Sequence, residues 1–278
     1  MRHRSFAALA LAAVASLGLA ACGGSGSTSS DASGSSSDVV TLTVGATPSP
    51  HAKILNYVND NLAADAGIKI KVVEYTDYVQ PNTALNDGEL DANFYQTVPY
   101  LENAEKQAGY DFEAGAGIHL EPLGVFSQKH KSLDELPNGG TIGIISDTSN
   151  QERALRLLAT QGLVSIPEGE GDVNVNTVTK LKDFSFNEVE GPQLVRSLED
   201  FDFAVINGNF AQEGGLSLSG DALVVESPVD NPAVNVLVWK GDSTKTDAIA
   251  KLEKLLHSDE VKQYIEQTWS DGSVIPAF

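Results

Sequence analysis

The sequence has a single cysteine, Cys22, among its 278 residues. One cysteine allows no disulfide within the chain and no metal site built from several thiolates. Basic residues are also scarce, with 18 lysines and arginines against 38 aspartates and glutamates and a formal net charge of −20. This excess of negative charge excludes nucleic acid as a natural partner and opposes attraction to an anionic bilayer.

Long hydrophobic runs are missing as well, since no apolar stretch reaches the roughly 18 residues that a membrane-spanning helix needs. The longest apolar run, residues 6–19, follows a basic start, as in an export signal. It leads into residues 19–22, Leu-Ala-Ala-Cys, which resemble the lipobox of a bacterial lipoprotein. We therefore expect residues 1–21 to be a signal peptide that is removed. Lipid on Cys22 would then hold the protein on the extracytoplasmic face of the cell membrane.

The composition changes after the cysteine. Residues 23–38 are almost all Gly, Ser, Ala, Thr and Asp, so residues 22–38 are expected to form a lipidated, flexible tether without a core. Residues 39–278 suit one large domain or two of ordinary size. The overall content of 41% hydrophobic and 20% charged residues is that of a globular protein.

Apolar periodicity predicts an α/β fold. Residues 40–44 and 68–75 alternate apolar and polar positions as strands do, and residues 50–66 repeat apolar positions at helical spacing. Such a β–α–β unit implies a parallel sheet with helices packed on it. The pattern recurs along the chain, with further helices expected over residues 81–87, 99–108, 149–161, 192–199, 246–256 and 259–269. For the helix over 149–161, Ser149 and Glu152 are expected to form a capping box.

Two crossings are expected between two lobes, near residues 120–125 and 226–232. The first lobe would comprise residues 39–123 with 227–278, and the second residues 124–226. Ligands of such folds bind in the crevice between lobes, near the carboxyl ends of strands.

Catalytic signatures are absent from the sequence. The five histidines are scattered, and neither a G-x-S-x-G elbow nor a phosphate-binding G-x-x-x-x-G-K-[ST] loop occurs. The loop beginning at Asp172 resembles a calcium loop at its start, but Thr177 replaces the glycine and Asp183 the bidentate glutamate that calcium needs. We therefore expect a binding protein without cofactor or metal, and not an enzyme.

One long stretch is specific to a known family. Residues 74–96 read Glu-Tyr-Thr-Asp-Tyr-Val-Gln-Pro-Asn-Thr-Ala-Leu-Asn-Asp-Gly-Glu-Leu-Asp-Ala-Asn-Phe-Tyr-Gln and are followed by Pro-Tyr-Leu at 99–101. This stretch closely resembles the methionine-binding lipoproteins of the NlpA family. Shorter matches follow in order at residues 119–122, 131–137, 150, 153–155, 204–207 and 234–236.

The resemblance covers the chain from about residue 41 to its end. It implies a two-lobed fold of the periplasmic-binding-protein kind (type II), in which each lobe is a mixed sheet flanked by helices and the ligand cleft lies between the lobes. It also implies delivery of methionine to the permease of an ABC importer, which its cytoplasmic ATPase drives.

The same resemblance implies residues for the polar end of the ligand. In the family, the position of Arg153 binds the amino acid's carboxylate, and a guanidinium does so through two parallel hydrogen bonds. Asn150, Asn207 and Asn235 match positions that bond the polar end or support that contact, and an amide can both donate and accept. Glu121 would balance the ammonium group or, alternatively, serve as a hinge residue.

For the thioether, Tyr78, Tyr95 and Tyr100 match aromatic positions of the family's side-chain pocket, where sulfur packs against ring edges. Thr97 departs from the family, which usually has histidine there, so we expect a roomier pocket. A methionine-containing dipeptide or another amino acid is therefore an alternative ligand. A surface or adhesion lipoprotein without a transport role is the alternative from another class.

Overall fold

The computed structural model describes residues 39–169 and 171–278, which belong to one compact unit. The expected signal peptide, the lipidation of Cys22 and the tether lie outside the described residues. Within the described ranges, no helix is both long and apolar enough to cross a membrane.

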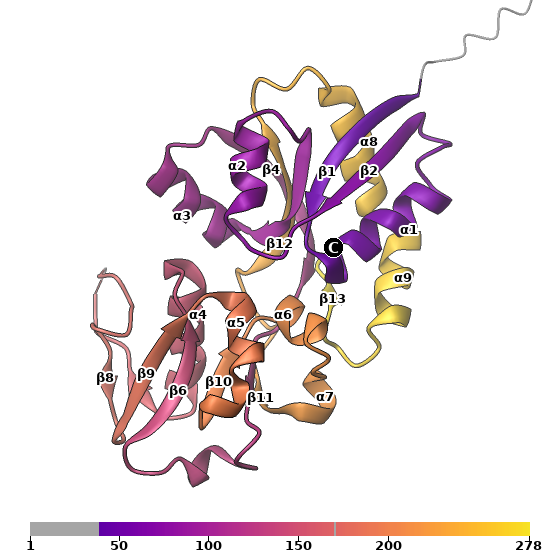
Figure 1. Cartoon of the computed structure of the whole chain (residues 1–278). Coiled ribbons are helices and arrows are strands. Elements are labelled where there is room, and N and C mark those ends of the chain that lie inside the picture. Colours follow the sequence, from indigo (N-terminus) through magenta and orange to yellow (C-terminus); the bar gives the residue numbers. More distant parts are fainter. Residues whose placement is uncertain (1–38, 170) are drawn as a thin grey trace, which may run out of the picture. The chain divides into compact units, whose positions relative to one another are not determined.

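A six-stranded mixed sheet, the first sheet, occupies the upper half of Figure 1. Its strand order is β13–β4–β12–β3–β1–β2, with β1 parallel to β2 and β3 and with β12 antiparallel to β3 and β4. The strands are β1 (Val40–Ala46), β2 (Ile68–Glu74), β3 (Ala92–Thr97), β4 (Phe112–Leu120), β12 (Val234–Lys240) and β13 (Ile275–Pro276).

Helices cover both faces of the first sheet. On one face α1 (Lys53–Asn61) and α8 (Thr246–Leu256) pack against β1 and β2, and α9 (Asp259–Thr268) packs beside α1 and β13. Their fully buried core includes Leu42, Ile54 and Leu252. On the other face α2 (Gln80–Asn86) and α3 (Val98–Ala108) cover β12 through Leu85 and Leu101. Burying apolar side chains on each face is what holds such a sheet in place.

A five-stranded mixed sheet, the second sheet, lies in the lower half of Figure 1 and has the order β11–β5–β10–β6–β9. Its strands are β5 (Gly124–Phe126), β6 (Gly140–Ile145), β9 (Phe184–Val189), β10 (Phe203–Ile206) and β11 (Ala222–Val225). One face is covered by α4 (Thr148–Thr160). The other face is covered by α5 (Gly191–Arg196), α6 (Gly208–Glu213) and α7 (Leu218–Asp221).

Smaller elements complete the fold. Their bounds are η1 (Pro48–Ala52), η2 (Leu133–Glu135), η3 (Leu198–Asp200), β7 (Val164–Ser165) and β8 (Thr179–Lys180). The η segments are single helical turns, and β7 and β8 pair with each other as a separate two-stranded sheet.

The chain passes between the two sheets through residues 121–123 and again through residues 226–233. The two passages are bonded to each other, because the backbone N–H of Glu226 donates to the Leu123 carbonyl (2.9 Å) and the Leu123 N–H donates to the Glu226 carboxylate (3.1 Å). The segments between the sheets therefore run as a bonded pair.

The first part of the chain differs from its sequence prediction in one helix. The α-helix expected over 50–66 is shorter, because residues 50–52 belong to η1 and regular α-helix runs from Lys53 to Asn61. Residues 62–67, which follow α1, form turns that end at Gly67, a residue with a positive φ of 68°.

The capping box predicted for α4 is wrong. Asp147, not Ser149, caps this helix: its carboxylate accepts the N–H of Asn150 at 2.9 Å. A carboxylate at this position also complements the positive end of the helix dipole. The helix therefore begins one residue earlier than expected, at Thr148.

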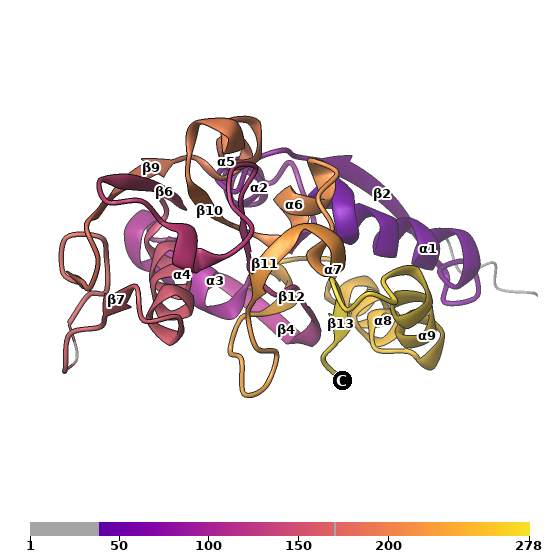
Figure 2. The same cartoon turned by 90° about the horizontal axis from the view of Figure 1, so that it is seen from below.

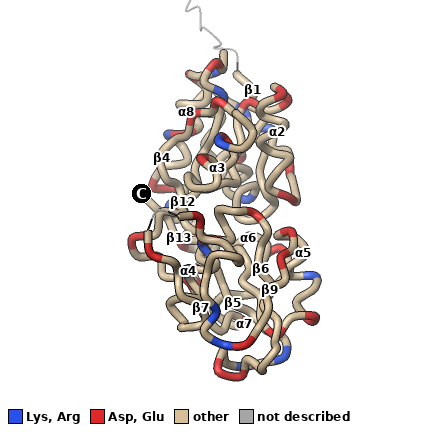
Figure 3. Tube along the Cα trace, turned by 90° about the vertical axis from the view of Figure 1, so that its left-hand side faces the viewer, with Lys and Arg blue, Asp and Glu red and all other residues tan. Residues whose placement is uncertain are grey.

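Acidic residues outnumber basic ones over both halves of the described chain, as the red and blue segments of Figure 3 show. They are spread over many elements instead of forming one patch. This distribution matches a role in solubility more closely than a role in binding one polycation.

Candidate functional site

A small cavity lies between the two sheets. Strands β3 and β12 of the first sheet, helices α4 and α6 beside the second sheet, and Glu121 in the first passage all contribute to its wall. All nine residues predicted from the sequence line it: Tyr78, Tyr95, Thr97, Tyr100, Glu121, Asn150, Arg153, Asn207 and Asn235.

Arg153 projects from the first turns of α4 and is largely buried, with 14% of its side chain exposed. Its Nε donates to Glu226 Oε1 at 2.9 Å, and its Nη2 donates to the other carboxylate oxygen and to the Glu121 carbonyl. The bidentate contact is thus made to Glu226. Among the described residues, Nη1 has no hydrogen-bond partner, so it can donate to a ligand in the cavity.

The three asparagines line the polar part of the cavity wall, and two of them are hydrogen-bonded to each other. Asn207, at the start of α6, donates through Nδ2 to Asn150 Oδ1 at 2.9 Å, and Asn150 in turn bonds the cap residue Asp147. Asn235 reaches the wall from β12, where its register partners are Thr97 on β3 and His119 on β4. Backbone pairing therefore fixes where the Asn235 side chain enters the cavity.

The three tyrosines form an aromatic wall on the first-sheet side. The hydroxyls of Tyr95 and Tyr100 both donate to the backbone carbonyl of Tyr78, at 2.9 and 2.8 Å. Ring centroids lie 6.0 Å apart for Tyr78 and Tyr95 and 5.7 Å apart for Tyr78 and Tyr100, spacings typical of tilted aromatic pairs. Burial raises the pKa of each phenol, so all three are neutral donors at physiological pH.

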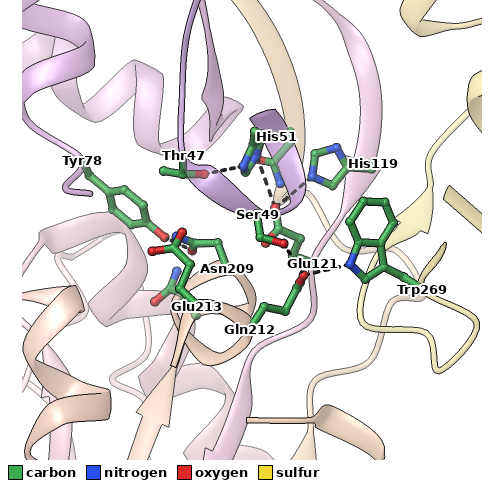
Figure 4. Close-up of polar contacts among 12 residues, drawn as sticks. Thr47, Ser49, His51, Tyr78, His119, Glu121, Asn209, Gln212, Glu213 and Trp269 are labelled. Atoms are coloured by element: carbon green, nitrogen blue, oxygen red, sulfur yellow. Dashed lines mark hydrogen bonds and ion pairs between the residues drawn. The ribbon is translucent and has the colours of Figure 1, made fainter. Parts of the chain in front are cut away.

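Tyr78 also joins the two sheets. Its ring stacks on Phe210 of α6 with centroids 4.7 Å apart, and its hydroxyl donates to Asn209 Oδ1. A second link runs through Gln212 of α6, whose Oε1 accepts from Ser49 (2.9 Å) and from the indole of Trp269 (2.8 Å). The hydrogen bonds of Tyr78 and Gln212, drawn in Figure 4, link α6 to residues of the half that contains the first sheet.

Glu121 lies just after β4 and is 5% exposed. Its Oε1 lies 2.8 Å from Nε2 of His119 and 3.3 Å from Nε2 of His51, and the three side chains converge in Figure 4. Burial raises the pKa of Glu121 to about 7 and lowers the pKa of His51 to about 4 and that of His119 to about 3. Both imidazoles are therefore neutral at pH 7.

Thr97 lines this cavity and also has a local structural role. As the N-cap of α3, its hydroxyl accepts the N–H of Tyr100 at 3.4 Å. Thr97, Asn150 and Arg153 also line a larger neighbouring cavity between α3, α4 and residues 225–233. The two cavities thus meet at these three residues.

Sequence reasoning missed several residues of the site. The cavity is also lined by His51, Gln96, Gly208 and Asn209. Glu226 accepts hydrogen bonds from the Arg153 guanidinium. Gln96 stands inside the family-like stretch, and its place beside Tyr95 was a signal that could have included it. A periodic sequence pattern could not have predicted the role of Glu226, because its contact with Arg153 joins positions 73 residues apart.

Together, the fold and this cavity define a two-lobed substrate-binding protein. Comparison with known proteins gives the family. The chain belongs to the NlpA lipoprotein family, whose model matches residues 42–278.

Solved and curated relatives agree with this assignment. A lipoprotein structure from Actinomyces odontolyticus is 88% identical and covers 87% of this chain and 100% of its own, with a TM-score of 0.85. The methionine-binding lipoprotein MetQ of Bacillus subtilis is 35% identical over 84% of this chain and 87% of its own length. A nutrient-binding protein from Burkholderia cenocepacia, solved bound to methionine, is 35% identical and covers 85% of this chain and 100% of its own, with a TM-score of 0.81.

Proposed function

We propose that this protein binds methionine as a zwitterion in the cavity between its sheets and delivers it to the permease of an ABC importer. The observation that carries the proposal is the convergence of one guanidinium, five side-chain amides and three tyrosines on a single small cavity. Once water is excluded, a free amino acid needs partners for its carboxylate, ammonium group and side chain, and these residues supply all three kinds.

The geometry supports the following roles. Arg153 Nη1 donates to the ligand's carboxylate, with the guanidinium held from behind by Glu226. The amides of Asn150, Asn207 and Asn235 bond the polar end. The thioether packs against the edges of the tyrosine rings, where each contact contributes roughly 0.3–1.5 kcal/mol.

The proposed lobes are residues 39–123 with 227–278 and residues 124–226. Their closure on the ligand produces the form that docks on the permease, which the importer's cytoplasmic ATPase drives. We further propose that residues 1–21 are removed and that lipid on Cys22 anchors the protein on the extracytoplasmic face of the membrane, with residues 23–38 as the tether.

The experiment has two steps. Mass spectrometry of natively purified protein identifies the retained small molecule, and calorimetry on unfolded and refolded protein then measures binding of L-methionine. The proposal expects methionine in the first step and saturable 1:1 binding in the second. Refolded protein that binds no amino acid would refute it and would favour a surface lipoprotein without a transport role.

A methionine-containing dipeptide is a second candidate because Thr97 stands where the site cavity meets the larger neighbouring one. A threonine side chain leaves room there that a histidine would occupy. Competition calorimetry separates the two ligands: the dipeptide is the natural one if it binds more tightly than methionine.

A further inference from the structure

Three ionisable side chains form a cluster at one end of the cavity: His51 from η1, His119 from β4 and Glu121 just after β4. Their exposed fractions are 1%, 0% and 5%. His51 and Glu121 line the cavity itself, whereas His119 lies behind them. Burial of three titratable groups against a ligand cavity is costly unless they have a use or are fully paired.

The contacts fix which ring nitrogens carry hydrogen. His51 Nε2 faces two acceptors, Asn235 Oδ1 at 3.1 Å and Glu121 Oε1 at 3.3 Å, so it must be a donor. Its Nδ1 then accepts from the Thr47 hydroxyl at 2.6 Å. His119 Nε2 donates to Glu121 Oε1 at 2.8 Å, which leaves the buried Nδ1 as a bare acceptor instead of an orphaned N–H.

In this assignment Oε2 of Glu121 keeps acceptor capacity for a ligand, while the backbone N–H of Asn209 also bonds the carboxylate. Oε1 accepts from both imidazoles, whereas Oε2 lies on the side of Gly208, which lines the cavity. A Cβ at Gly208 would stand 2.9 Å from the Glu121 Cβ and 3.3 Å from Oε2. Glycine at this position therefore lets Glu121 lie against the cavity wall.

The cluster lacks a cation of its own. Because both imidazoles are neutral at pH 7, burial leaves Glu121 protonated in about half of the molecules at that pH. The ionisable groups that face Glu121 are those of His51, His119, Arg153, Glu213 and Tyr78. The one permanent cation among them, Arg153, is already paired with Glu226. An arriving ammonium group would supply the missing positive charge.

We propose that His51 and His119 hold Glu121 as the acceptor for the primary ammonium group of the ligand, and that binding expels the proton which the Glu121 carboxyl carries in the empty site. The proton passes to solvent, while the ligand keeps its three ammonium hydrogens and donates one of them to Oε2. The inference rests on the proposed function and deepens it: the site accepts only ligands with a free α-amino group.

A metal ion is the other occupant to consider, since the three donor atoms lie within 4.8 Å of one another. Two observations disfavour it. In the tautomers assigned above both Nε2 atoms donate hydrogen bonds, whereas metal ligation needs their lone pairs. The separation of 2.8 Å between His119 and Glu121 is also that of a direct hydrogen bond.

Calorimetry of L-methionine binding in two buffers of different ionisation enthalpy tests the proton step. At pH 7 the wild-type protein should release about half a proton per methionine, and affinity should rise about thirtyfold from pH 5.5 to pH 8. Glu121→Gln should bind more weakly, release no proton and lose the pH dependence. Glu190→Gln, an exposed carboxylate outside the cavity, is the matched control and should behave as wild type.

A second arm needs no variant. N-acetyl-L-methionine, which cannot carry an ammonium group, should bind at least a hundredfold more weakly than methionine, and one equivalent of Zn²⁺ should leave methionine affinity unchanged. Methionine binding without proton release, equal binding of the N-acetyl compound, or blockage by stoichiometric Zn²⁺ would each overturn the proposal while leaving the methionine assignment intact. Failure of refolded wild-type protein to bind methionine at all would instead overturn both.

Discussion

Replacement of Arg153 by alanine should abolish most methionine binding. The side chain is 14% exposed and is held in a charge pair with Glu226, so the ligand's carboxylate would lose its one cationic partner in a desolvated site. Removing one partner of such a pair costs about 2–5 kcal/mol. At 1.4 kcal/mol for each factor of ten, the dissociation constant should rise about 30- to 4,000-fold.

The same helix offers a matched control. Arg156 lies one turn further along α4, is 57% exposed and pairs with Glu152, which should make Arg156→Ala change methionine affinity by no more than about twofold. Arg153→Lys keeps the charge but loses the planar fork, so its affinity should fall between wild type and the alanine variant. Calorimetry on refolded proteins, with circular dichroism to verify folding, is the assay. Equal methionine affinities for the folded Arg153→Ala and Arg156→Ala variants would refute the assigned role of the guanidinium.

Four further perturbations test other parts of the site. Glu226→Gln should weaken methionine binding about tenfold in calorimetry, because the guanidinium loses the carboxylate that orients it, a charge-assisted bond of about 1.5 kcal/mol. Thr97→Ala should lower the free energy of unfolding by about 1 kcal/mol in urea titrations, since it removes the N-cap of α3. Gln212→Leu should speed methionine dissociation about tenfold in stopped-flow measurements, because it removes two hydrogen bonds that link α6 to residues of the half that contains the first sheet. Between about pH 4.5 and 7, the raised pKa of Glu121 means that its carboxyl keeps a proton in the folded state that it releases in the unfolded state. Over this pH rise the ligand-free wild-type protein should therefore lose up to about 3 kcal/mol of unfolding free energy relative to Glu121→Gln.

The sequence predicted the α/β architecture well because its signals are local. Alternation in residues 40–44 and 68–75 matches β1 and β2, and Gly109, which has a φ of 72°, ends α3 directly after Ala108 as expected. Short elements carry too few residues for a periodic signal. Strands such as β11 and β13, four and two residues long, were therefore not predicted.

For the site, the family-like stretches gave residues that the structure brings to one cavity. Residues that act through long-range pairing were missed. His51 reaches the cavity only because η1 folds back toward β12, and its bond to Asn235 joins positions 184 residues apart. Nothing in the local sequence around His51 distinguishes it from a surface histidine, so its place beside Glu121 follows from the tertiary fold alone.

The central claim is that methionine lies in this cavity with its thioether among the tyrosines. Crystals of refolded protein grown with L-selenomethionine test it directly, because the chain has no methionine besides Met1 and ordered selenium must come from the ligand. The account predicts one strong anomalous peak against the rings of Tyr78, Tyr95 and Tyr100. A peak elsewhere in the molecule, or no peak in crystals whose cavity is filled by another molecule, would contradict it.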